Sequence, residues 1–203
     1  MVLCFLLALS VTGAGAAAPA RGETDERYDE LFKKYSKRYF GPGYDWRLFK
    51  AQALAESNLV PGARSHCGAR GIMQLMPTTF GEIQSKNPEL KSIDDPEWNI
   101  AAGICYDRTL WRAWVEHPTD KDRESFMLGS YNAGRGTLLR AQSTARARQL
   151  DHRTWKGITE VAAAVRGWRY RETLGYVERI EAFLETLSSA PAAAKPASSP
   201  KPK

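Results

Sequence analysis

The chain has 203 residues, 43% of them apolar, and a formal net charge of +6. This length supports one hydrophobic core rather than two, so we expect a single domain. The positive charge favours an anionic partner, but no run of Lys and Arg is dense enough for a nucleic-acid surface, so we expect no nucleic acid to bind.

The first 20 residues form an apolar run that passes into small residues, as in a secretory signal peptide. We expect cleavage near Ala16 to Ala20, and therefore a periplasmic or exported protein. The run is too short for an ordinary transmembrane helix, although an uncleaved anchor is the alternative. Residues 21–27 are expected to form a linker. The Pro-, Ala-, Ser- and Lys-rich residues 188–203 have nothing to bury and are expected to form a disordered tail.

The folded domain is expected over residues 28–187, where apolar residues recur at helical spacing and few segments alternate as strands do. This pattern predicts a mainly α domain with little or no β-structure. A first helix is expected over residues 25–39, before a Gly-Pro-Gly stop. A second runs from Asp45, its N-cap, to Asn58. A short third helix is expected to have Thr78 as its N-cap.

Three longer helices are expected to complete the domain. The first has Asp95 as its N-cap and a proline at its first position, and its core face extends to Val115. The second ends at two glycines, Gly134 and Gly136. The third covers residues 170–187. It has an apolar face and another face that carries a glutamate and a tyrosine four residues apart.

Two cysteines, Cys67 and Cys105, remain once the signal peptide is removed. An even pair in an exported protein predicts one disulfide, which would staple the loop that carries Cys67 to the helix that carries Cys105. Two buried free thiols are the alternative. We expect neither a metal nor another cofactor, because metal-ligand spacings are not found among His66, His117 and His152.

Glu56 lies on an apolar face of the second expected helix. Trp46, Phe49 and Ala53 precede it on that face at helical spacing. Burial disfavours the charged form of a carboxyl and raises its pKa toward the range in which it can donate a proton at neutral pH. Glu56 is therefore a candidate general acid, and a hydrogen-bonded structural glutamate is the alternative.

Four short strings occur in the order found in one enzyme family: Glu56-Ser57, GIMQLMP at 71–77, SYNAG at 130–134 and ETLGYV at 172–177. Through them the chain resembles the soluble-type lytic transglycosylases of family 1, over nearly the whole expected domain. The resemblance implies a single-domain, goose-lysozyme-like fold with a substrate cleft. It also implies cleavage of the β-1,4 bond between N-acetylmuramic acid and N-acetylglucosamine in peptidoglycan, which gives 1,6-anhydromuramoyl products.

By the same resemblance, Glu56 is the catalytic glutamate, which first protonates the glycosidic oxygen and then deprotonates the C6 hydroxyl of the muramoyl sugar. Ordinary glycosidases use a second carboxylate. The motifs predict no acid beside Glu56, which fits attack by the sugar's own hydroxyl rather than by water. A goose-type lysozyme-like hydrolase that uses water is one alternative, and a non-catalytic glycan-binding module of an envelope-spanning assembly is another.

The resemblance further implies a set of substrate-binding residues: Ser65, Gln74, Met76, Tyr131, Asn132, Glu172 and Tyr176. Gln74 and Met76 are expected to line the glycan groove, with an amide for hydroxyl groups and a thioether for sugar faces. Met73 and Leu75, which alternate with them, are expected to face the core.

Three of these positions have structural alternatives. Ser65 can be an ordinary serine of a polar loop, and Asn132 can brace the turn before Gly134. Glu172 can be a capping or salt-bridge residue. The expected partners are the glycan strands of peptidoglycan and envelope-spanning secretion or pilus machinery, and we expect a monomer.

Overall fold

The computed structural model describes residues 26–189. The expected cleavage at Ala16 to Ala20, most of the expected linker and most of the expected tail lie outside this range. Within it the chain is helical, and its only β-pairing consists of isolated bridges that join Arg64 to Arg70 and Arg70 to Leu75. The prediction of a mainly α domain is confirmed. No helix within the described range is both long and apolar enough to cross a membrane.

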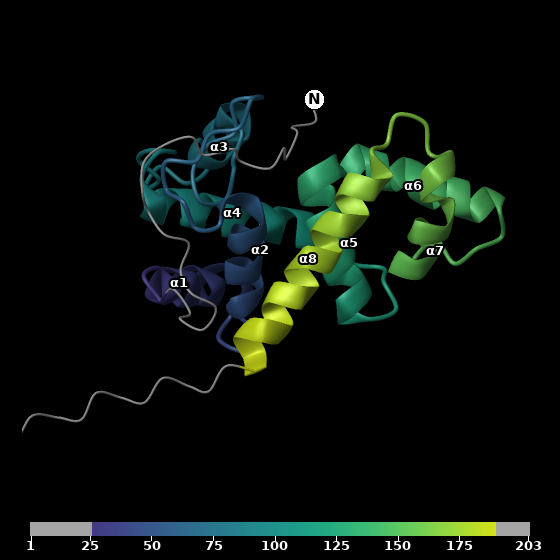
Figure 1. Ribbon diagram of the computed structural model, residues 1–203, viewed down its shortest axis with the longest axis horizontal. Coiled ribbons are helices and arrows are strands. Elements are labelled where there is room, and N and C mark those ends of the chain that lie inside the picture. The colour runs from purple at the N-terminus through teal and green to yellow at the C-terminus, as the bar shows by residue number, and fades with distance from the viewer. Residues whose placement is uncertain (1–25, 190–203) are drawn as a thin grey trace, which may run out of the picture.

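The described residues form eight α-helices and one short 3-10 helix, in this order: α1 Asp29–Phe40, α2 Arg47–Ser57, α3 Pro77–Gln84, α4 Pro96–Ala113, α5 Asp120–Ala133, α6 Arg135–Ala147, α7 Trp155–Val161, η1 Ala162–Ala164 and α8 Tyr170–Ser189. Figure 1 shows α8 crossing the middle of the molecule, with α1 to α4 toward one side and α6 and α7 toward the other. α8 packs along α2 and contacts α5, while α1 packs against α4. The last helix therefore joins the early and late parts of the chain.

Asp95 is the N-cap of α4 as predicted, whereas the N-cap of α2 is Trp46 rather than the predicted Asp45. The Asp95 carboxylate accepts two N–H groups from the first turn of α4, at 2.9 and 3.3 Å. Asp45 lies one residue before the N-cap of α2, and its carboxylate still accepts the N–H of Arg47 at 3.0 Å. α2 ends where Asn58 adopts the left-handed conformation with φ of 53°, which Asn tolerates better than most residues.

Three predicted helix boundaries are wrong by a few residues. α1 begins at Asp29, four residues later than predicted. α3 begins at Pro77, so Met76 rather than Thr78 is its N-cap, because the first turn of a helix tolerates a proline that lacks an N–H group. Val115, predicted on the core face of α4, lies beyond the end of that helix and is 65% exposed.

Gly134 ends α5 as predicted, with φ of 81° and its N–H bonded to Ser130 O at 2.8 Å. The next helix, α6, begins at the following residue. Gly136, the other predicted stop, therefore lies inside α6. Sequence periodicity does not indicate α6 and α7. Their buried positions include small residues such as Ala141 and Gly157, which give little hydrophobic contrast.

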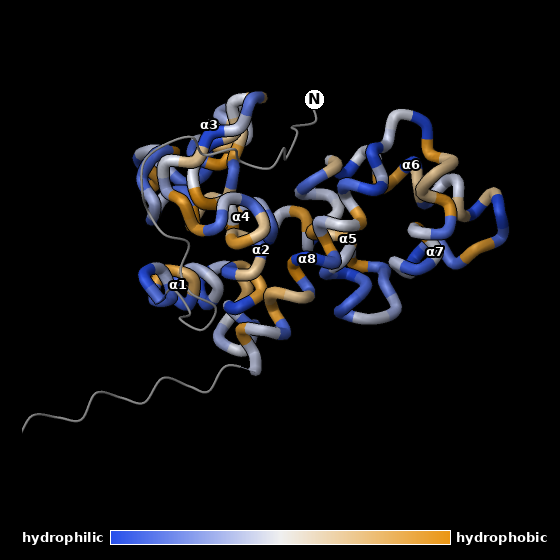
Figure 2. The backbone as a smooth tube through the Cα atoms, viewed as in Figure 1, coloured by the Kyte–Doolittle hydropathy of each residue, from blue (hydrophilic) through white to orange (hydrophobic). Residues whose placement is uncertain are grey.

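The interior holds two clusters of buried apolar side chains. One fills the space among α1, α2, α4, α5 and α8 and includes Phe49, Met73 and Tyr176. The other lies mainly among α5, α6 and α7 and includes Phe126 and Leu138. Figure 2 shows apolar residues, in orange, recurring between polar ones along the helices. Burial of these stripes is the main stabilising force available to an all-helical domain.

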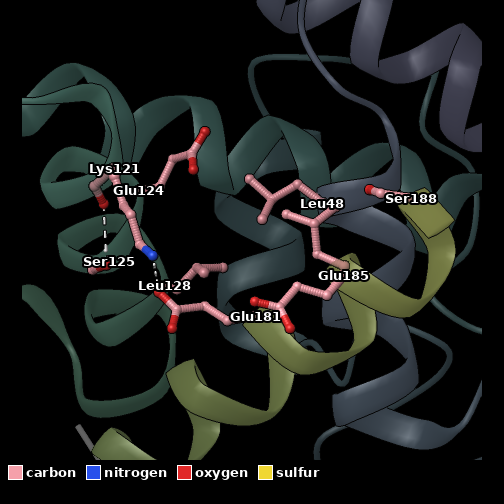
Figure 3. Close-up of a pocket in the computed structure, with 9 residues that line it drawn as sticks. Leu48, Lys121, Glu124, Ser125, Leu128, Glu181, Glu185 and Ser188 are labelled. Carbon is pink, nitrogen blue, oxygen red and sulfur yellow. Dashed lines mark hydrogen bonds and ion pairs between the residues drawn. The ribbon is translucent and has the colours of Figure 1, made fainter.

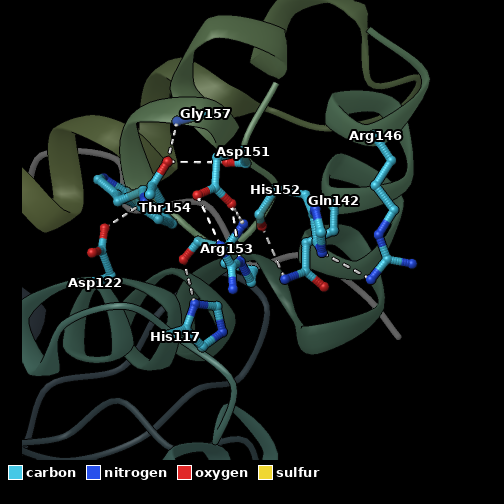
Figure 4. Close-up of polar contacts among 10 residues, drawn as sticks. His117, Asp122, Gln142, Arg146, Asp151, His152, Arg153, Thr154 and Gly157 are labelled. Carbon is cyan, nitrogen blue, oxygen red and sulfur yellow. Dashed lines mark hydrogen bonds and ion pairs between the residues drawn. The ribbon is translucent and has the colours of Figure 1, made fainter. Parts of the chain in front are cut away.

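A polar network holds the turn before α7 against the start of α5 (Figure 4). The Asp122 carboxylate, on α5, accepts the N–H of Trp155, the first residue of α7, at 2.7 Å. His117 Nδ1, in the loop between α4 and α5, bonds to Arg153 O at 2.6 Å. These contacts fix α7 beside the second apolar cluster.

Among the described residues, Cys67 and Cys105 are not joined by a disulfide, so the predicted staple is wrong. The loop that carries Cys67 is bonded to α4 through Asn99. Cys105 comes six residues after Asn99, which means about 9 Å further along the helix and about 240° around it. The Cys105 thiol instead lies 3.9 Å from Asn87 Nδ2, which donates to it.

A cavity of about 280 Å³ lies where the start of α2 meets α5 and the end of α8 (Figure 3). Leu48, Leu128 and Leu184 line it, and Lys121 Nζ lies 3.7 Å from Glu181 Oε1 across it. Leu48 is in the first turn of α2, whereas the candidate acid Glu56 is in the last. This cavity is therefore separate from the site described below.

Candidate active site

Glu56 lies in the last turn of α2, which packs along α8. Tyr176 Oη, on α8, donates a hydrogen bond to Glu56 Oε1 at 2.6 Å. Tyr176 is fully buried, whereas Glu56 is only partly buried, so the protein fixes one oxygen of a carboxyl that still reaches solvent. The structure thus brings together two predicted site residues that are 120 positions apart in the sequence.

Burial raises the pKa of Glu56 to about 8. The hydrogen bond from Tyr176 and the positive charge of Arg179 act in the opposite direction, because both stabilise the carboxylate, but their effect is smaller. At neutral pH the Glu56 carboxyl is therefore mainly protonated. This is the state that a general acid needs before the reaction begins.

The loop between α2 and α3 is bonded to three helices. Ser57 Oγ, at the end of α2, donates to Ile72 O at 2.8 Å. Tyr131 Oη, on α5, donates to Met73 O at 2.7 Å. On α4, Asn99 Oδ1 accepts the N–H of Met73 at 2.8 Å, and Asn99 Nδ2 donates to another carbonyl of the loop at 3.0 Å. The loop that contains the GIMQLMP string is therefore held firmly against the helix that carries Glu56.

Gly71 is required by this arrangement. Its φ of 77° lies in the left-handed region, and a Cβ atom at this position would lie 2.3 Å from Asn99 Nδ2. Gly71 therefore makes a sharp turn, and the close neighbour of its backbone is the Asn99 side chain.

The predicted alternation along the GIMQLMP string is confirmed. Met73 and Leu75 are buried in the core, while Gln74 and Met76 are partly exposed. Gln74 has a positive φ of 46°, and its Nε2 donates to two carbonyls of its own loop at 2.8 and 3.2 Å. The amide nitrogen of Gln74 therefore stabilises the loop, a role that the sequence does not indicate.

Ser65 closes a tight turn within the same loop. Its Oγ accepts the N–H of Ala69 at 3.0 Å, and its own N–H donates to Ala69 O at 3.0 Å. These contacts agree with the alternative reading of Ser65 as a polar loop residue. A contact between Ser65 and the substrate stays a prediction.

Asn132 and Glu172 make contacts with protein groups at the start of α8. Asn132 Oδ1 accepts from Thr173 Oγ1 at 2.8 Å, and Thr173 Oγ1 in turn accepts from Trp168 Nε1 at 3.0 Å. Asn132 therefore ties α5 to α8. Glu172 forms an ion pair with Arg169 at 3.2 Å, as its structural alternative predicted.

Three residues near Glu56 are not predicted from the sequence: Gln52, Asp107 and Arg179. Asn99, which anchors the loop, is not predicted either. Gln52 has a detectable signal, because it precedes Glu56 by four residues and so shares its helix face. Asp107 is 0% exposed and interacts electrostatically with Glu56. An acid is therefore near Glu56, at a position outside the four motifs. The sequence does not reveal Asp107 because it lies on α4, which only the tertiary fold brings to α2.

Comparisons with known proteins agree with this geometry. Residues 30–153 match the family model described as the transglycosylase SLT domain. The chain is 30% identical over 172 residues to the membrane-bound lytic murein transglycosylase F of Desulfosudis oleivorans. This alignment covers 79% of this chain and 36% of that protein. It is 34% identical over 152 residues to the protein of the same name from Marinobacter nauticus, and this alignment covers 74% of this chain and 29% of that protein. The chain thus spans about a third of the length of these curated relatives.

Among solved structures, the fold is similar to the 70 kDa soluble lytic transglycosylase of Escherichia coli, with a TM-score of 0.60 and 25% sequence identity. That likeness covers 81% of this chain and 25% of the other, and the predicted lysozyme-like fold is confirmed. The family match spans more than half of the chain and includes Glu56, the GIMQLMP string and Tyr131. The chain therefore belongs to the transglycosylase SLT domain family.

Proposed function

We propose that this chain is a lytic transglycosylase that cleaves the β-1,4 bond between N-acetylmuramic acid and N-acetylglucosamine in peptidoglycan. The observation that carries the proposal is the state of Glu56. It is a partly exposed carboxyl with a pKa of about 8, held through one oxygen by the buried Tyr176. The relatives named as lytic murein transglycosylases support the same chemistry.

In the first step, protonated Glu56 donates its proton to the bridging glycosidic oxygen as the bond from that oxygen to C1 of the muramoyl sugar breaks. Tyr176 donates to Oε1, so the proton is best carried on Oε2, which is then the oxygen that faces the substrate. The leaving sugar departs with a new hydroxyl group. Positive charge develops at C1, where the substrate's own N-acetyl oxygen can stabilise it.

In the second step, the Glu56 carboxylate removes the proton of the C6 hydroxyl, and O6 attacks C1 to close the 1,6-anhydro ring. Glu56 ends the cycle protonated, as it began, so the reaction consumes no water and needs no second proton carrier. The hydrogen bond from Tyr176 and the charge of Arg179 stabilise the carboxylate that exists between the steps. One residue thus serves as acid and then as base.

The burial of Asp107 favours this route over hydrolysis. A hydrolase of this kind needs a second carboxylate that activates water or attacks the sugar. Asp107 is the acid whose pKa the charge of Glu56 influences, but it is 0% exposed and bonded to Gln52. It therefore has no access to water or substrate, and the C6 hydroxyl of the substrate remains the available nucleophile.

We infer that the glycan strand contacts the exposed parts of the loop between α2 and α3 and the neighbouring surface of α5. Met76 and Gln74 offer a thioether and an amide oxygen there, and Tyr131 lies where α5 meets this loop. Ser65, Asn132 and Glu172 belong to the proposed site as residues that shape its walls, because each of them bonds to protein groups.

Digestion of purified sacculi tests the proposal. The wild type is expected to release anhydromuramoyl products, which mass spectrometry identifies because they are lighter by one water than hydrolytic products. Glu56→Gln is expected to release none above background. Glu160→Gln, an exposed glutamate on α7, is the matched control and is expected to retain full activity. Equal anhydro product from wild type and Glu56→Gln would refute the mechanism, and reducing muramic-acid ends would identify a hydrolase.

We also propose that the protein acts as a monomer in the periplasm or outside the cell, since its substrate lies there, and that it opens the wall for an envelope-spanning secretion or pilus assembly. A gene deletion is expected to reduce assembly of such a machine, and complementation with Glu56→Gln is expected not to restore it. Normal assembly in the deletion strain would count against this partner.

A further inference from the structure

Two buried polar side chains face each other across the contact between α2 and α4. Gln52, on α2, and Asp107, on α4, are each 0% exposed. Gln52 Nε2 donates to Asp107 Oδ1 at 3.3 Å. Gln52 lies one turn before Glu56 on the same face of α2, and Asp107 interacts electrostatically with Glu56. The pair is therefore part of the surroundings of the proposed catalytic carboxyl.

Each member of the pair has one buried oxygen that lacks a hydrogen-bond partner, namely Gln52 Oε1 and Asp107 Oδ2. Buried polar atoms in folded proteins are nearly always hydrogen-bonded. These two oxygens are both acceptors, so they cannot bond to each other as they stand. A single proton on Asp107 Oδ2 satisfies both, because the new O–H group can donate to Gln52 Oε1 while Gln52 Nε2 continues to donate to Oδ1.

The titratable groups that face Asp107 offer no positive charge to balance a carboxylate. They are Glu56 from α2, Tyr44 from the segment before α2, Tyr106 from α4 itself, Tyr131 from α5 and Tyr176 from α8. Each of these groups is either neutral or becomes negative when it ionises. Burial therefore raises the pKa of the Asp107 carboxyl well above its ordinary value, and the charge of Glu56 acts in the same direction.

We propose that Asp107 is held as a neutral carboxylic acid, joined to the Gln52 amide by two reciprocal hydrogen bonds, and that this pair positions Glu56. Two antiparallel bonds fix the Gln52 turn of α2 against α4 in both distance and rotation. The neutral state also keeps a negative charge away from Glu56, which has to become a carboxylate once it has given up its proton. A second carboxylate at this place would oppose that step.

Asp107→Asn is the decisive variant, because an asparagine amide copies the protonated acid. Its oxygen can accept from Gln52 Nε2, and its NH₂ group can donate to Gln52 Oε1. We expect Asp107→Asn to melt no lower than wild type and to release anhydromuramoyl products within about twofold of the wild-type rate, with an unchanged pH profile. Asp107→Leu removes both bonds and is expected to lower kcat while KM changes little, because it disturbs Glu56 rather than the glycan contacts.

Infrared difference spectroscopy measures the proton directly. The comparison uses Glu56→Gln as the parent, so that the protonated carboxyl of Glu56 does not contribute. We expect a carboxylic-acid C=O band at neutral pH in Glu56→Gln that is absent from Glu56→Gln/Asp107→Asn. If the two spectra are the same in that region, Asp107 is ionised and the proposal is overturned. Asp120→Asn, an exposed aspartate at the start of α5, is the control that should leave the band unchanged.

The positioning role rests on the proposed function, but the protonation of Asp107 does not. If the wild type releases no anhydromuramoyl product, the function fails while the infrared band still decides the state of Asp107. A folded Asp107→Asn that loses more than about tenfold in kcat would show that catalysis needs an ionisable Asp107, which would overturn the positioning role. Asp107→Leu with unchanged kcat would overturn it as well. If Asp107→Leu does not fold, the asparagine variant still decides the question.

Discussion

Tyr176 donates a 2.6 Å hydrogen bond to Glu56, although the two residues are 120 positions apart. The bond joins the last turn of α2 to the buried face of α8, and α8 lies outside the part of the chain that matches the family model. Because the bond is made to one carboxyl oxygen only, it orients the Glu56 side chain and leaves the other carboxyl oxygen available for the substrate. The α2–α8 contact is therefore the structural basis of the proposed site.

Tyr176→Phe tests this contact. The change removes the hydrogen bond and keeps the buried ring, so the Glu56 carboxylate loses a stabilising donor and its pKa rises further above about 8. A hydrogen bond to a charged group contributes about 1.5–3 kcal/mol, which corresponds to roughly tenfold to a hundredfold in kcat. We expect a loss of this size in anhydromuramoyl release, with the alkaline limb of the pH profile displaced to higher pH.

Tyr170→Phe, a partly exposed tyrosine at the start of the same helix, is the control for Tyr176→Phe. It is expected to have the wild-type rate and pH profile. If Tyr176→Phe also has the wild-type profile, the hydrogen bond does not influence the ionisation of Glu56.

Glu56→Gln is expected to be more stable than wild type at neutral pH. The pKa of Glu56 is about 8 in the folded state and about 4.3 in an unfolded chain, so the folded state binds the proton more tightly. The stabilising effect of that proton is fully present below about pH 4.3 and is lost as the pH rises through about 8. Between these limits the wild type loses up to about 1.4 kcal/mol of unfolding free energy per pH unit relative to Glu56→Gln.

Urea unfolding of both proteins from pH 4 to pH 8 measures this difference. Burial also raises the pKa of Asp107, so its proton too stabilises the folded state. Asp107 is present in both proteins, however, and its effect on the unfolding free energy cancels in the comparison. A difference in unfolding free energy that stays constant across this range would mean that Glu56 titrates alike in the folded and unfolded states.

Gly71→Ala is expected to destabilise the protein by more than about 2 kcal/mol. The added Cβ would meet the Asn99 side chain at 2.3 Å, and the φ of 77° is unfavourable for alanine. The Asn99 contact with Met73 would be disturbed too, so activity should fall with stability. Thermal unfolding followed by circular dichroism measures the first effect, and sacculus digestion measures the second.

Gly81→Ala is the matched control, because Gly81 lies in α3 with open space around its Cβ position. Replacing a glycine in an exposed helix by alanine is expected to stabilise the protein by about 0.5–1 kcal/mol. If Gly71→Ala behaves as Gly81→Ala does, the contact between Gly71 and Asn99 does not restrict this position.

Reducing agents are expected to leave the melting temperature unchanged, because Cys67 and Cys105 are not joined in the structure. Cys105→Ser is expected to destabilise the protein by about 1 kcal/mol, since it places a hydroxyl in a partly buried site near Asn87. Differential scanning calorimetry with and without dithiothreitol measures the first effect. A lower melting temperature in dithiothreitol would restore the original disulfide hypothesis.

Local sequence determines much of this protein. The start of α4 after Asp95 and the stops at Asn58 and Gly134 follow from capping chemistry that acts within a few residues, and the start of α2 lies within one residue of the predicted cap Asp45. The apolar face of α2 places Glu56 at the edge of the core, because helical periodicity alone determines which residues share a face. These features were predictable, since their causes lie within one helix.

The tertiary structure decides what surrounds Glu56. Neither the donor Tyr176 nor the buried Asp107 is on α2, and their distance from Glu56 depends on how α8 and α4 pack against it. The disulfide prediction failed for the same kind of reason, because the even cysteine count carries no information about which face of α4 the loop with Cys67 packs against. The sequence by itself determined that Glu56 is an acid on an apolar helix face. Helix packing decided its pKa and its hydrogen bond, because desolvation and bonding partners depend on groups from distant segments.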